Sequence, residues 1–477
     1  MTTSAAASPH PPVAEKRPQS RTLFGQTLTD DYAWLRDRKD PNVIAYLEAE
    51  NAYTDSMTRG SKPLQDALYA EMLARIQQTD LTVPYRKGSY LYYQRTEEGR
   101  QYPLYCRRHD APGAPEEVVL DLNRLAEGHP FMALGVYDVS PNERLLAYST
   151  DSTGYRQYVL HVKDLSTGAT LPVTAERVTS AAWDADSRVL FYTQEDPVSK
   201  RSYRLYQQDL GMPRPVLLDE ERDARFDVEV ALTRSGEWLT YTIASHTTSE
   251  VRVLRADQPF AQWTPVAPRV QDHEYYLDHS GDHFYIRAND TGRNFRLVTA
   301  PVDAPGPGQW RELIPARDSV MLTGVECFSD HLVLSEREHA LPQLTVLDLK
   351  TGARRRVEFP EPAYTVGPAA NEEFVTGEFR YAYQSFLTPP SVYDLDVRTF
   401  QSALRKRQPV LGGWDPARYA MERLWVPARD GARVPLTLVH RRDLPRDGGA
   451  PCLLYGYGSY GLPANVTFNS ARFSLLD

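Results

Sequence analysis

Val136-Tyr-Asp-Val-Ser-Pro-Asn-Glu-Arg-Leu-Leu-Ala-Tyr-Ser149 is the stretch of sequence that decides the fold. It reads as an apolar strand, a polar turn at Pro141-Asn142 and a second apolar strand. The same pattern recurs in three later segments: 181–193, 230–242 and 276–286. A further strand that ends in an Asp-centred turn, such as Asp164-Leu165, follows these segments. The chain therefore contains a repeated unit of short antiparallel strands.

The spacing of this unit indicates a β-propeller. The clear copies lie roughly 44 to 50 residues apart, and a period of roughly 40–50 residues with four strands per unit is typical of propeller blades. About seven units fit between residues 80 and 400 when weaker copies are included. These begin near Tyr85, Val325 and Glu373. Two β-sandwich domains are the alternative, but they would not repeat a strand-turn-strand element at near-constant intervals. We expect a mainly β protein with a seven-bladed β-propeller over residues 81–400.

The segment before the repeats has a different character. Residues 1–20 are rich in Ala, Ser, Pro and Thr without an apolar core, which predicts a disordered tail rather than a signal peptide. Residues 21–80 read as helical, because Asp40-Pro41 forms a helix start and apolar residues then recur at helical spacing. We expect an N-terminal helical extension over residues 21–80.

The segment after the repeats reads as the beginning of another domain. Residues 400–420 look like a polar connector, and three strands are predicted after it: 419–427, 434–440 and 451–455. The last of these is apolar on both faces, as in a central strand of an α/β sheet that helices cover. Residues 472–476 could form one more strand. Residues 401–477 therefore predict an incomplete α/β domain.

Composition and charge exclude several classes of protein. A net charge of -9 argues against a nucleic-acid partner, and no apolar run is long enough to predict a membrane span. Three unpatterned cysteines favour a reducing, cytoplasmic location over a disulfide framework. No Walker loop, dinucleotide fingerprint or Cys-x-x-Cys pair is present, so no cofactor is predicted.

Ser459 is a candidate nucleophile, because Gly458-Ser-Tyr-Gly461 looks like half of a Gly-x-Ser-x-Gly elbow. The residue two positions before it is a tyrosine, however, and no histidine follows His440. A hydrolase of this kind needs an acid and then a histidine after its serine. The sequence predicts that Ser459 is not a nucleophile.

Tyr457 is the better catalytic candidate. Its hydroxyl lies between Gly456 and Gly458, which can adopt positive φ and let the backbone approach a substrate. A phenol in that position can donate a hydrogen bond to a developing oxyanion. A purely structural tyrosine in a tight turn is the alternative that these residues leave open.

A histidine-rich stretch in the repeats is not expected to bind metal. His273, His279 and His283 alternate with Asp278 and Asp282 around the turn of a propeller hairpin. Their spacing matches no compact set of metal ligands. We expect most of these side chains to face solvent, and no metal site is predicted.

Taken together, these features resemble the prolyl oligopeptidase family of serine peptidases, and within it the oligopeptidase B branch. Three motifs carry the resemblance: Asp31-Tyr-Ala-Trp-Leu-Arg-Asp37, Tyr46-Leu-Glu-Ala-Glu-Asn51 and Leu454-Tyr-Gly-Tyr-Gly-Ser-Tyr-Gly461. The resemblance implies that residues 401–477 begin an α/β-hydrolase domain on which the N-terminal helices pack. It also implies an unclosed propeller that filters short peptide substrates by size. Tyr457 would be the oxyanion-hole tyrosine, while the serine, aspartate and histidine of the triad would lie beyond Asp477.

One departure from the oligopeptidase B pattern concerns substrate recognition. Two aspartates of that branch help to receive a basic substrate side chain, and the matching positions here are Asn465 and Thr467. The leading hypothesis is a serine oligopeptidase that cleaves short peptides after basic residues, with the given chain inactive by itself. A propeller that serves only as a binding module, and a non-peptidase α/β-hydrolase, are the alternatives.

Overall fold

The computed structural model describes residues 10–477, so residues 1–9 of the predicted tail lie outside the described residues. The chain divides into two compact units. One contains the residues up to Ile76 together with 470–475 and Asp477, and the other contains residues 77–469 and Leu476. None of the described helices is long and apolar enough to cross a membrane.

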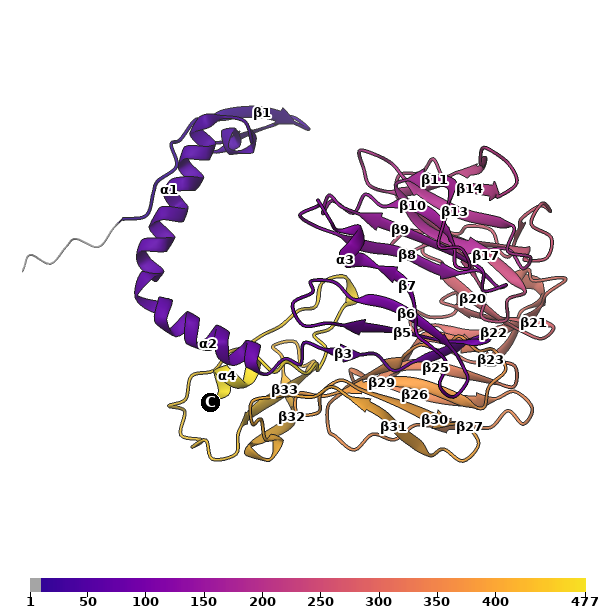
Figure 1. Ribbon diagram of the computed structural model, residues 1–477. Coiled ribbons are helices and arrows are strands. Elements are labelled where there is room, and N and C mark those ends of the chain that lie inside the picture. Colours follow the sequence, from indigo (N-terminus) through magenta and orange to yellow (C-terminus); the bar gives the residue numbers. More distant parts are fainter. Residues whose placement is uncertain (1–9) are drawn as a thin grey trace, which may run out of the picture. The chain divides into compact units, whose positions relative to one another are not determined.

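The larger unit contains the predicted propeller, built from seven consecutive antiparallel sheets (Figure 1). The first has five strands: β3 (Asp80–Leu81), β4 (Tyr85–Lys87), β5 (Tyr90–Thr96), β6 (Leu104–His109) and β7 (Glu117–Asp121). A short helix, α3 (Leu122–Leu125), leads to the second sheet. The second sheet contains β8 (Ala133–Val139), β9 (Leu145–Asp151), β10 (Val159–Asp164) and β11 (Thr170–Glu176). The third contains β12 (Val178–Trp183), β13 (Val189–Glu195), β14 (Ser202–Asp209) and β15 (Val216–Glu220).

The remaining four sheets repeat this four-stranded order. The fourth contains β16 (Asp227–Leu232), β17 (Trp238–Ala244), β18 (Ser249–Arg255) and β19 (Thr264–Pro265). The fifth contains β20 (Tyr275–Ser280), β21 (His283–Ala288), β22 (Arg296–Pro301) and β23 (Arg311–Ile314). The sixth contains β24 (Val320–Cys327), β25 (His331–Glu338), β26 (Leu341–Asp348) and β27 (Arg354–Arg356). The seventh contains β28 (Thr365–Pro368), β29 (Glu378–Gln384), β30 (Ser391–Asp396) and β31 (Ser402–Arg407). The seven-bladed propeller predicted from the repeats is confirmed.

The blades are held together by apolar side chains between neighbouring sheets. Between the third and fourth blades, Phe191 packs in one buried cluster with Phe226, Val228 and Tyr241. Each of these four side chains is at most 3% exposed. At about 25 cal/mol per Å² of buried apolar surface, each such side chain contributes on the order of 2 kcal/mol relative to full exposure. Inter-blade burial therefore stabilises the ring of sheets.

The seventh and first blades are joined by side chains and not by a shared sheet. Among the described residues, no strand from one end of the propeller completes the sheet at the other end. Instead, Arg380 donates to the backbone oxygen of Pro84 at 2.7 Å, and Lys406 donates to the Asp80 carboxylate at 2.6 Å. This is the unclosed arrangement that the resemblance implied.

Strand β31 lies in the segment that was expected to be a connector. Ser402–Arg407 has almost no apolar character, and five of its six residues are exposed. As the outermost strand of its blade it pairs on one side only, with β30. An edge strand can be polar because it buries little, so the hydrophobic pattern gave no signal for it.

The prediction of a helical extension over residues 21–80 was wrong for its first part, which lies in the smaller unit. β1 (Gln19–Leu23) and β2 (Gln26–Asp30) form an antiparallel hairpin there. Its turn residues Phe24 and Gly25 have φ of 52° and 78°, as a tight two-residue hairpin turn requires. The rest follows the prediction, with η1 (Ala33–Arg36), α1 (Pro41–Thr58), η2 (Arg59–Ser61) and α2 (Lys62–Ala74). Asp40 caps α1 by accepting from Asn42 N at 2.8 Å.

Candidate functional site

Two strands of the predicted second domain are present as a hairpin. β32 (Tyr419–Pro427) and β33 (Arg433–Arg441) pair over their full length, and the turn between them includes Gly431 at a φ of 86°. The hairpin contacts the propeller at His339, which lies between β25 and β26. Arg423 donates to the His339 backbone oxygen, and the Trp425 and His339 rings meet edge to face at 6.2 Å.

The predicted strand at residues 451–455 is not formed. The segment has no regular secondary structure, and Leu453, Leu454 and Tyr455 are 83%, 80% and 78% exposed. A strand with two apolar faces needs neighbouring strands on both edges and helices above and below. None of the described residues supplies them, so the expected exposed apolar surface is confirmed while the strand is not. Residues 472–476, also expected to be a strand, form the helix α4 (Arg472–Leu476).

Tyr457 lies in the exposed loop that follows this segment. Its side chain is 52% exposed and makes no hydrogen bond with any residue that the structure describes. A Cβ placed on Gly456 or Gly458 would meet nothing within 4 Å, and neither glycine has a left-handed φ. The positive φ expected beside Tyr457 falls instead on Tyr460 at 56° and Gly461 at 72°. The hydroxyl of Tyr457 is therefore available to a ligand.

The two candidate specificity positions lie on a segment anchored to the propeller. Val466 is buried, while Asn465 and Thr467 on either side of it are exposed. Next to them, the Phe468 backbone N–H donates to the Gln384 side chain at 2.9 Å, and the Phe468 ring packs edge to face against Trp414 at 5.4 Å. This anchoring presents residues 465 and 467 outward.

The contacts of residues 419–468 place this segment on one face of the propeller. His246 and His339 lie in the turns between the second and third strands of the fourth and sixth blades, and Gln384 ends β29 directly before the equivalent turn of the seventh blade. The Tyr460 ring stacks on His246 with centroids 6.1 Å apart. Equivalent turns of a propeller lie at the same end of its axis. The Tyr457 loop thus lies over that face.

Arg234 spans the opposite end of the propeller axis. It follows β16 of the fourth blade, yet its Nε donates to the Asn371 backbone oxygen at 2.6 Å, after β28 of the seventh blade. Its other nitrogens pair with the Glu326 carboxylate at 2.5 Å and donate to the Cys327 backbone oxygen at 3.2 Å, both in the sixth blade. Non-neighbouring blades meet only near the axis. Arg234 therefore links the fourth, sixth and seventh blades across this end of the axis.

Further charged side chains surround Arg234 at the ends of the innermost strands. Lys87 of the first blade pairs with Asp138 of the second at 3.2 Å and with Glu372 near the seventh at 4.0 Å. In the fifth blade, Asp278 accepts from the Cys327 backbone N–H at 2.8 Å. Burial raises the pKa of both Asp138 and Asp278. These contacts tie neighbouring blades together at this end of the axis.

His279 is an exception to the expectation that most side chains of the histidine-rich stretch face solvent. It is fully buried: one ring nitrogen lies 2.8 Å from Ser235 Oγ and the other 2.7 Å from the Gly281 backbone oxygen. It packs between Trp238 and Phe284 because its position in the hairpin faces the neighbouring blade. His279 is thus a structural residue.

Sequence reasoning missed Arg234 and His246. Both lie in turns, where polar residues are expected to be solvated, and nothing in the repeat pattern distinguishes them. No histidine among the described residues hydrogen-bonds Ser459, and its exclusion as the nucleophile stays a prediction. Of the predicted residues, the structure brings Tyr457, Asn465 and Thr467 onto one exposed segment.

The three cysteines give a simple test of this arrangement. Cys452 is exposed, whereas Cys106 and Cys327 are buried, and burial raises the pKa of Cys106 to about 11. In the 477-residue chain we expect one thiol to react rapidly with Ellman's reagent and two to react only in denaturant, because the thiolate is the reactive form. Cys452→Ser should abolish the rapid phase. A rapid phase that survives this substitution would contradict the structure.

Comparisons with known proteins agree with this architecture. The family model for the prolyl oligopeptidase N-terminal β-propeller domain matches residues 11–408. Dipeptidyl aminopeptidase BI of Pseudoxanthomonas mexicana is 40% identical over 500 residues, which cover 100% of this chain and 69% of that protein. Protease 2 of Moraxella lacunata is 31% identical, over 98% of this chain and 68% of its own length.

Solved structures show the same similarity. Oligopeptidase B from Leishmania major superposes with a TM-score of 0.89 at 29% sequence identity, covering 96% of this chain and 69% of that one. Oligopeptidase B from Trypanosoma brucei, with covalently bound antipain, superposes with a TM-score of 0.90 at 29% identity, covering 98% and 70%. The propeller fold and these similarities define a propeller-bearing peptidase. The chain belongs to the prolyl oligopeptidase family of serine peptidases.

Proposed function

We propose that this protein is a serine-type oligopeptidase that hydrolyses short peptides, with the propeller as a size filter. The observation that carries the proposal is the position of the Tyr457 loop over one face of a propeller whose blades Arg234 links at the other end of the axis. A substrate at Tyr457 would be shielded by the propeller face, which short peptides can enter and folded proteins cannot.

The chemistry is acyl transfer to a serine that residues 1–477 do not supply. In the proposed enzyme the serine attacks the peptide carbonyl, a histidine takes and returns the proton, and an aspartate orients the histidine. Tyr457 donates its phenolic hydrogen to the carbonyl oxygen as negative charge develops there. Residues beyond Asp477 would supply the triad and cover the exposed segment 451–455.

The N-terminal helices are proposed to pack on that catalytic domain. The structure supports this within the smaller unit, where α2 contacts α4 near the end of the chain. Arg75 donates to Ser474 Oγ, and Ser474 in turn donates to Glu71 at 3.0 Å. The three unpaired cysteines fit a cytoplasmic location, which we propose for the protein.

Cleavage after basic residues is the finer part of the proposal. Asn465 and Thr467 would flank the substrate side chain without the two aspartates of the oligopeptidase B pattern. In the catalytically complete enzyme, Asn465→Asp should raise kcat/KM for an Arg-Arg peptide over an Ala-Arg peptide by about fivefold, because a new ion pair contributes about 1 kcal/mol.

Asn142→Asp is the matched control for this prediction, because Asn142 is exposed in a turn between the first and second strands of a blade, at the other end of the propeller. It should leave the ratio of the two kcat/KM values unchanged. If Asn465→Asp left this ratio unchanged, residue 465 would not contact the substrate side chain.

A second candidate function is suggested by the 40% identical relative, which is named a dipeptidyl aminopeptidase. Such an enzyme would release dipeptides from a free amino terminus, whereas an oligopeptidase also cleaves blocked peptides. The oligopeptidase proposal therefore predicts that peptides with a blocked amino terminus are hydrolysed as well as peptides with a free one.

The test compares Ala-Arg coupled to a fluorogenic amine, with the amino terminus either free or acetylated. The oligopeptidase proposal expects both substrates to be hydrolysed by the complete enzyme. Hydrolysis of the free form alone would favour the dipeptidyl aminopeptidase. Hydrolysis of neither, while a simple ester is cleaved, would favour a non-peptidase hydrolase, and the absence of any hydrolysis would favour a binding module.

A further inference from the structure

A pocket of about 560 Å³ lies between the first and second blades. Strands β6, β7 and β10 and the turns β4–β5, β8–β9 and β10–β11 form its walls. These turns join the first strand of a blade to the second, or the third to the fourth, so they lie at the opposite end of the propeller from the turns that the Tyr457 loop contacts. The pocket is therefore separate from the proposed catalytic centre.

Two cations that line this pocket have no carboxylate partner among the described residues. Lys163 is partly buried, and its Nζ donates to the Val119 backbone oxygen at 2.7 Å without forming an ion pair. Arg144 is exposed in the β8–β9 turn, and its guanidinium forms neither an ion pair nor a hydrogen bond with the part of the chain that the structure describes. An ammonium group donates three hydrogen bonds and a guanidinium five, so most of these donors are unused.

The surroundings of Lys163 are themselves positive. Burial, and then the charges of Arg124 and Arg107, lower the pKa of Lys163. Arg107 comes from β6 of the first blade and is only 4% exposed. A partly buried ammonium group next to other cations is destabilised unless an anion compensates it.

The two carboxylates of the pocket are already engaged. Glu117 accepts from Arg107 Nε at 2.8 Å. Glu143 accepts from the Ser89 backbone N–H at 2.5 Å and from the Ser89 hydroxyl. The lining therefore has more cations than carboxylates, and the unused groups are donors.

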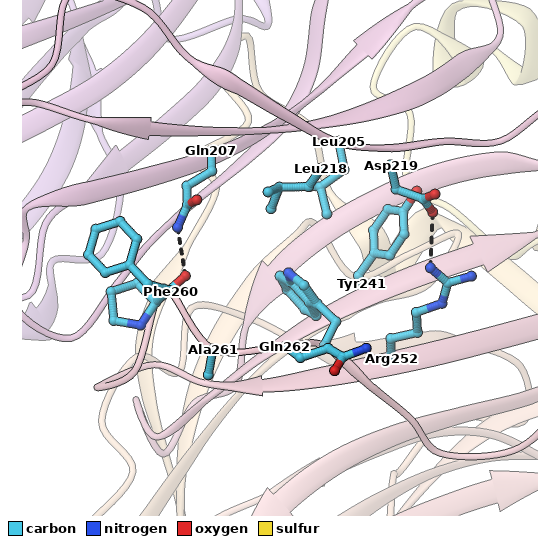
Figure 2. A pocket seen from close by; sticks show the side chains of 11 residues that line it. Leu205, Gln207, Leu218, Asp219, Tyr241, Arg252, Phe260, Ala261 and Gln262 are labelled. Carbon is cyan, nitrogen blue, oxygen red and sulfur yellow. Dashed lines mark hydrogen bonds and ion pairs between the residues drawn. The ribbon is translucent and has the colours of Figure 1, made fainter.

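The hollow between the third and fourth blades lacks this excess (Figure 2). There, Asp219 and Arg252 form an ion pair at 3.1 Å, and the Gln207 amide donates to the Pro259 backbone oxygen at 2.6 Å. The charged side chains of that hollow satisfy each other. Unpaired cations are thus not a general property of the hollows between blades.

One wall of the pocket between the first and second blades is aromatic. The Tyr90 and His109 rings stack with centroids 4.1 Å apart, and His109 is exposed. Val118, which also lines the pocket, is 45% exposed. The pocket is larger than a bare phosphate requires and leaves room for an organic group beside this wall.

We propose that this pocket binds a small phosphate monoester with an aromatic organic group. The three terminal oxygens of a phosphoryl dianion accept hydrogen bonds from several directions, as the separate donors of Arg144 and Lys163 require. Arginine binds such oxygens with two parallel hydrogen bonds. The aromatic group packs on His109 and Val118. The ligand would thus join the cations of the second blade to a wall of the first.

Phenyl phosphate is the probe, and phosphorus-31 NMR with the 477-residue chain measures its binding. The chain is expected to broaden the phosphorus resonance in a saturable way. Inorganic phosphate should compete more weakly, because it lacks the ring, and benzoate at the same ionic strength should not compete. The absence of saturable broadening would overturn the proposal. Equal competition by benzoate would overturn the phosphoryl assignment, and equal competition by inorganic phosphate would overturn the aromatic part.

Arg144→Gln should raise the dissociation constant of phenyl phosphate by about tenfold, because a charge-assisted hydrogen bond is lost. Arg144 is exposed, so the fold should be unaffected. Arg354→Gln is the matched control: Arg354 is also exposed without an ion pair or hydrogen bond among the described residues, but it lies on β27 of the sixth blade. Its dissociation constant should stay within about twofold of the parent chain, because distant exposed charges are screened. Equal dissociation constants in the two variants would contradict the assignment.

Discussion

Tyr457→Phe is expected to lower kcat by about 100-fold in the enzyme that joins residues 1–477 to the nucleophile, with KM changed by less than about threefold. Tyr457 is 52% exposed and its hydroxyl makes no hydrogen bond with any described residue, so the loss of that hydroxyl should not disturb the fold. A donor used only as the oxyanion forms stabilises the transition state and not the bound substrate, and therefore affects kcat alone. Steady-state kinetics with an Arg-containing fluorogenic peptide measures both constants.

Tyr460→Phe is the matched control in the same loop. Its side chain is 84% exposed and its ring stacks on His246, a contact that the phenylalanine ring retains. Its kcat should stay within about twofold of the parent enzyme. A comparable loss in both variants would mean that the loop, rather than the Tyr457 hydroxyl, sets the rate. No loss in Tyr457→Phe would make Tyr457 a structural turn residue.

Arg234→Met is expected to lower the free energy of unfolding by about 3 kcal/mol, because removal of one partner of a largely buried ion pair leaves the other charge uncompensated. Arg234 is 17% exposed in its side chain and Glu326 is 21% exposed. The substitution also deprives the backbone oxygens of Asn371 and Cys327 of their donor. Urea denaturation followed by tryptophan fluorescence gives the midpoint and slope.

Arg225→Met is the control for the burial argument. Arg225 pairs with Asp223 at 2.6 Å, but its side chain is 66% exposed, and exposed pairs contribute at most about 1 kcal/mol. A loss in Arg234→Met no larger than in Arg225→Met would show that Arg234 does not tie the blades together across the axis.

The propeller could be predicted from sequence because each blade is specified locally. Val136–Ser149 and its later copies carry their own turns and alternating apolar residues, and β8–β9 forms where this pattern indicated. The side chains that link distant blades could not be predicted in this way. Arg234 meets residues 92 and 137 positions further along the chain, and His279 is buried by the neighbouring blade. Both depend on the assembled ring of blades, which no local pattern encodes.

The candidate site was predicted less completely for a related reason. The Tyr457 loop was identified by its glycines and tyrosines, but residues 451–455 and 472–476 were expected to be strands. Apolar composition alone cannot form a sheet without partner strands, and here residues 451–455 stay irregular while Arg472–Leu476 forms a helix that contacts α2. The contact between Tyr460 and His246 could be found only from the structure, because the two residues are far apart in the sequence.

The central claim is that these 477 residues provide the propeller and an oxyanion donor but no nucleophile. Hydrolysis of an Arg-containing fluorogenic peptide by the purified 477-residue chain tests it most directly. The account predicts no turnover above the rate in buffer, with or without a serine-directed phosphonate. Measurable hydrolysis that the phosphonate abolishes would contradict it, because a serine such as Ser459 would then have to act as the nucleophile.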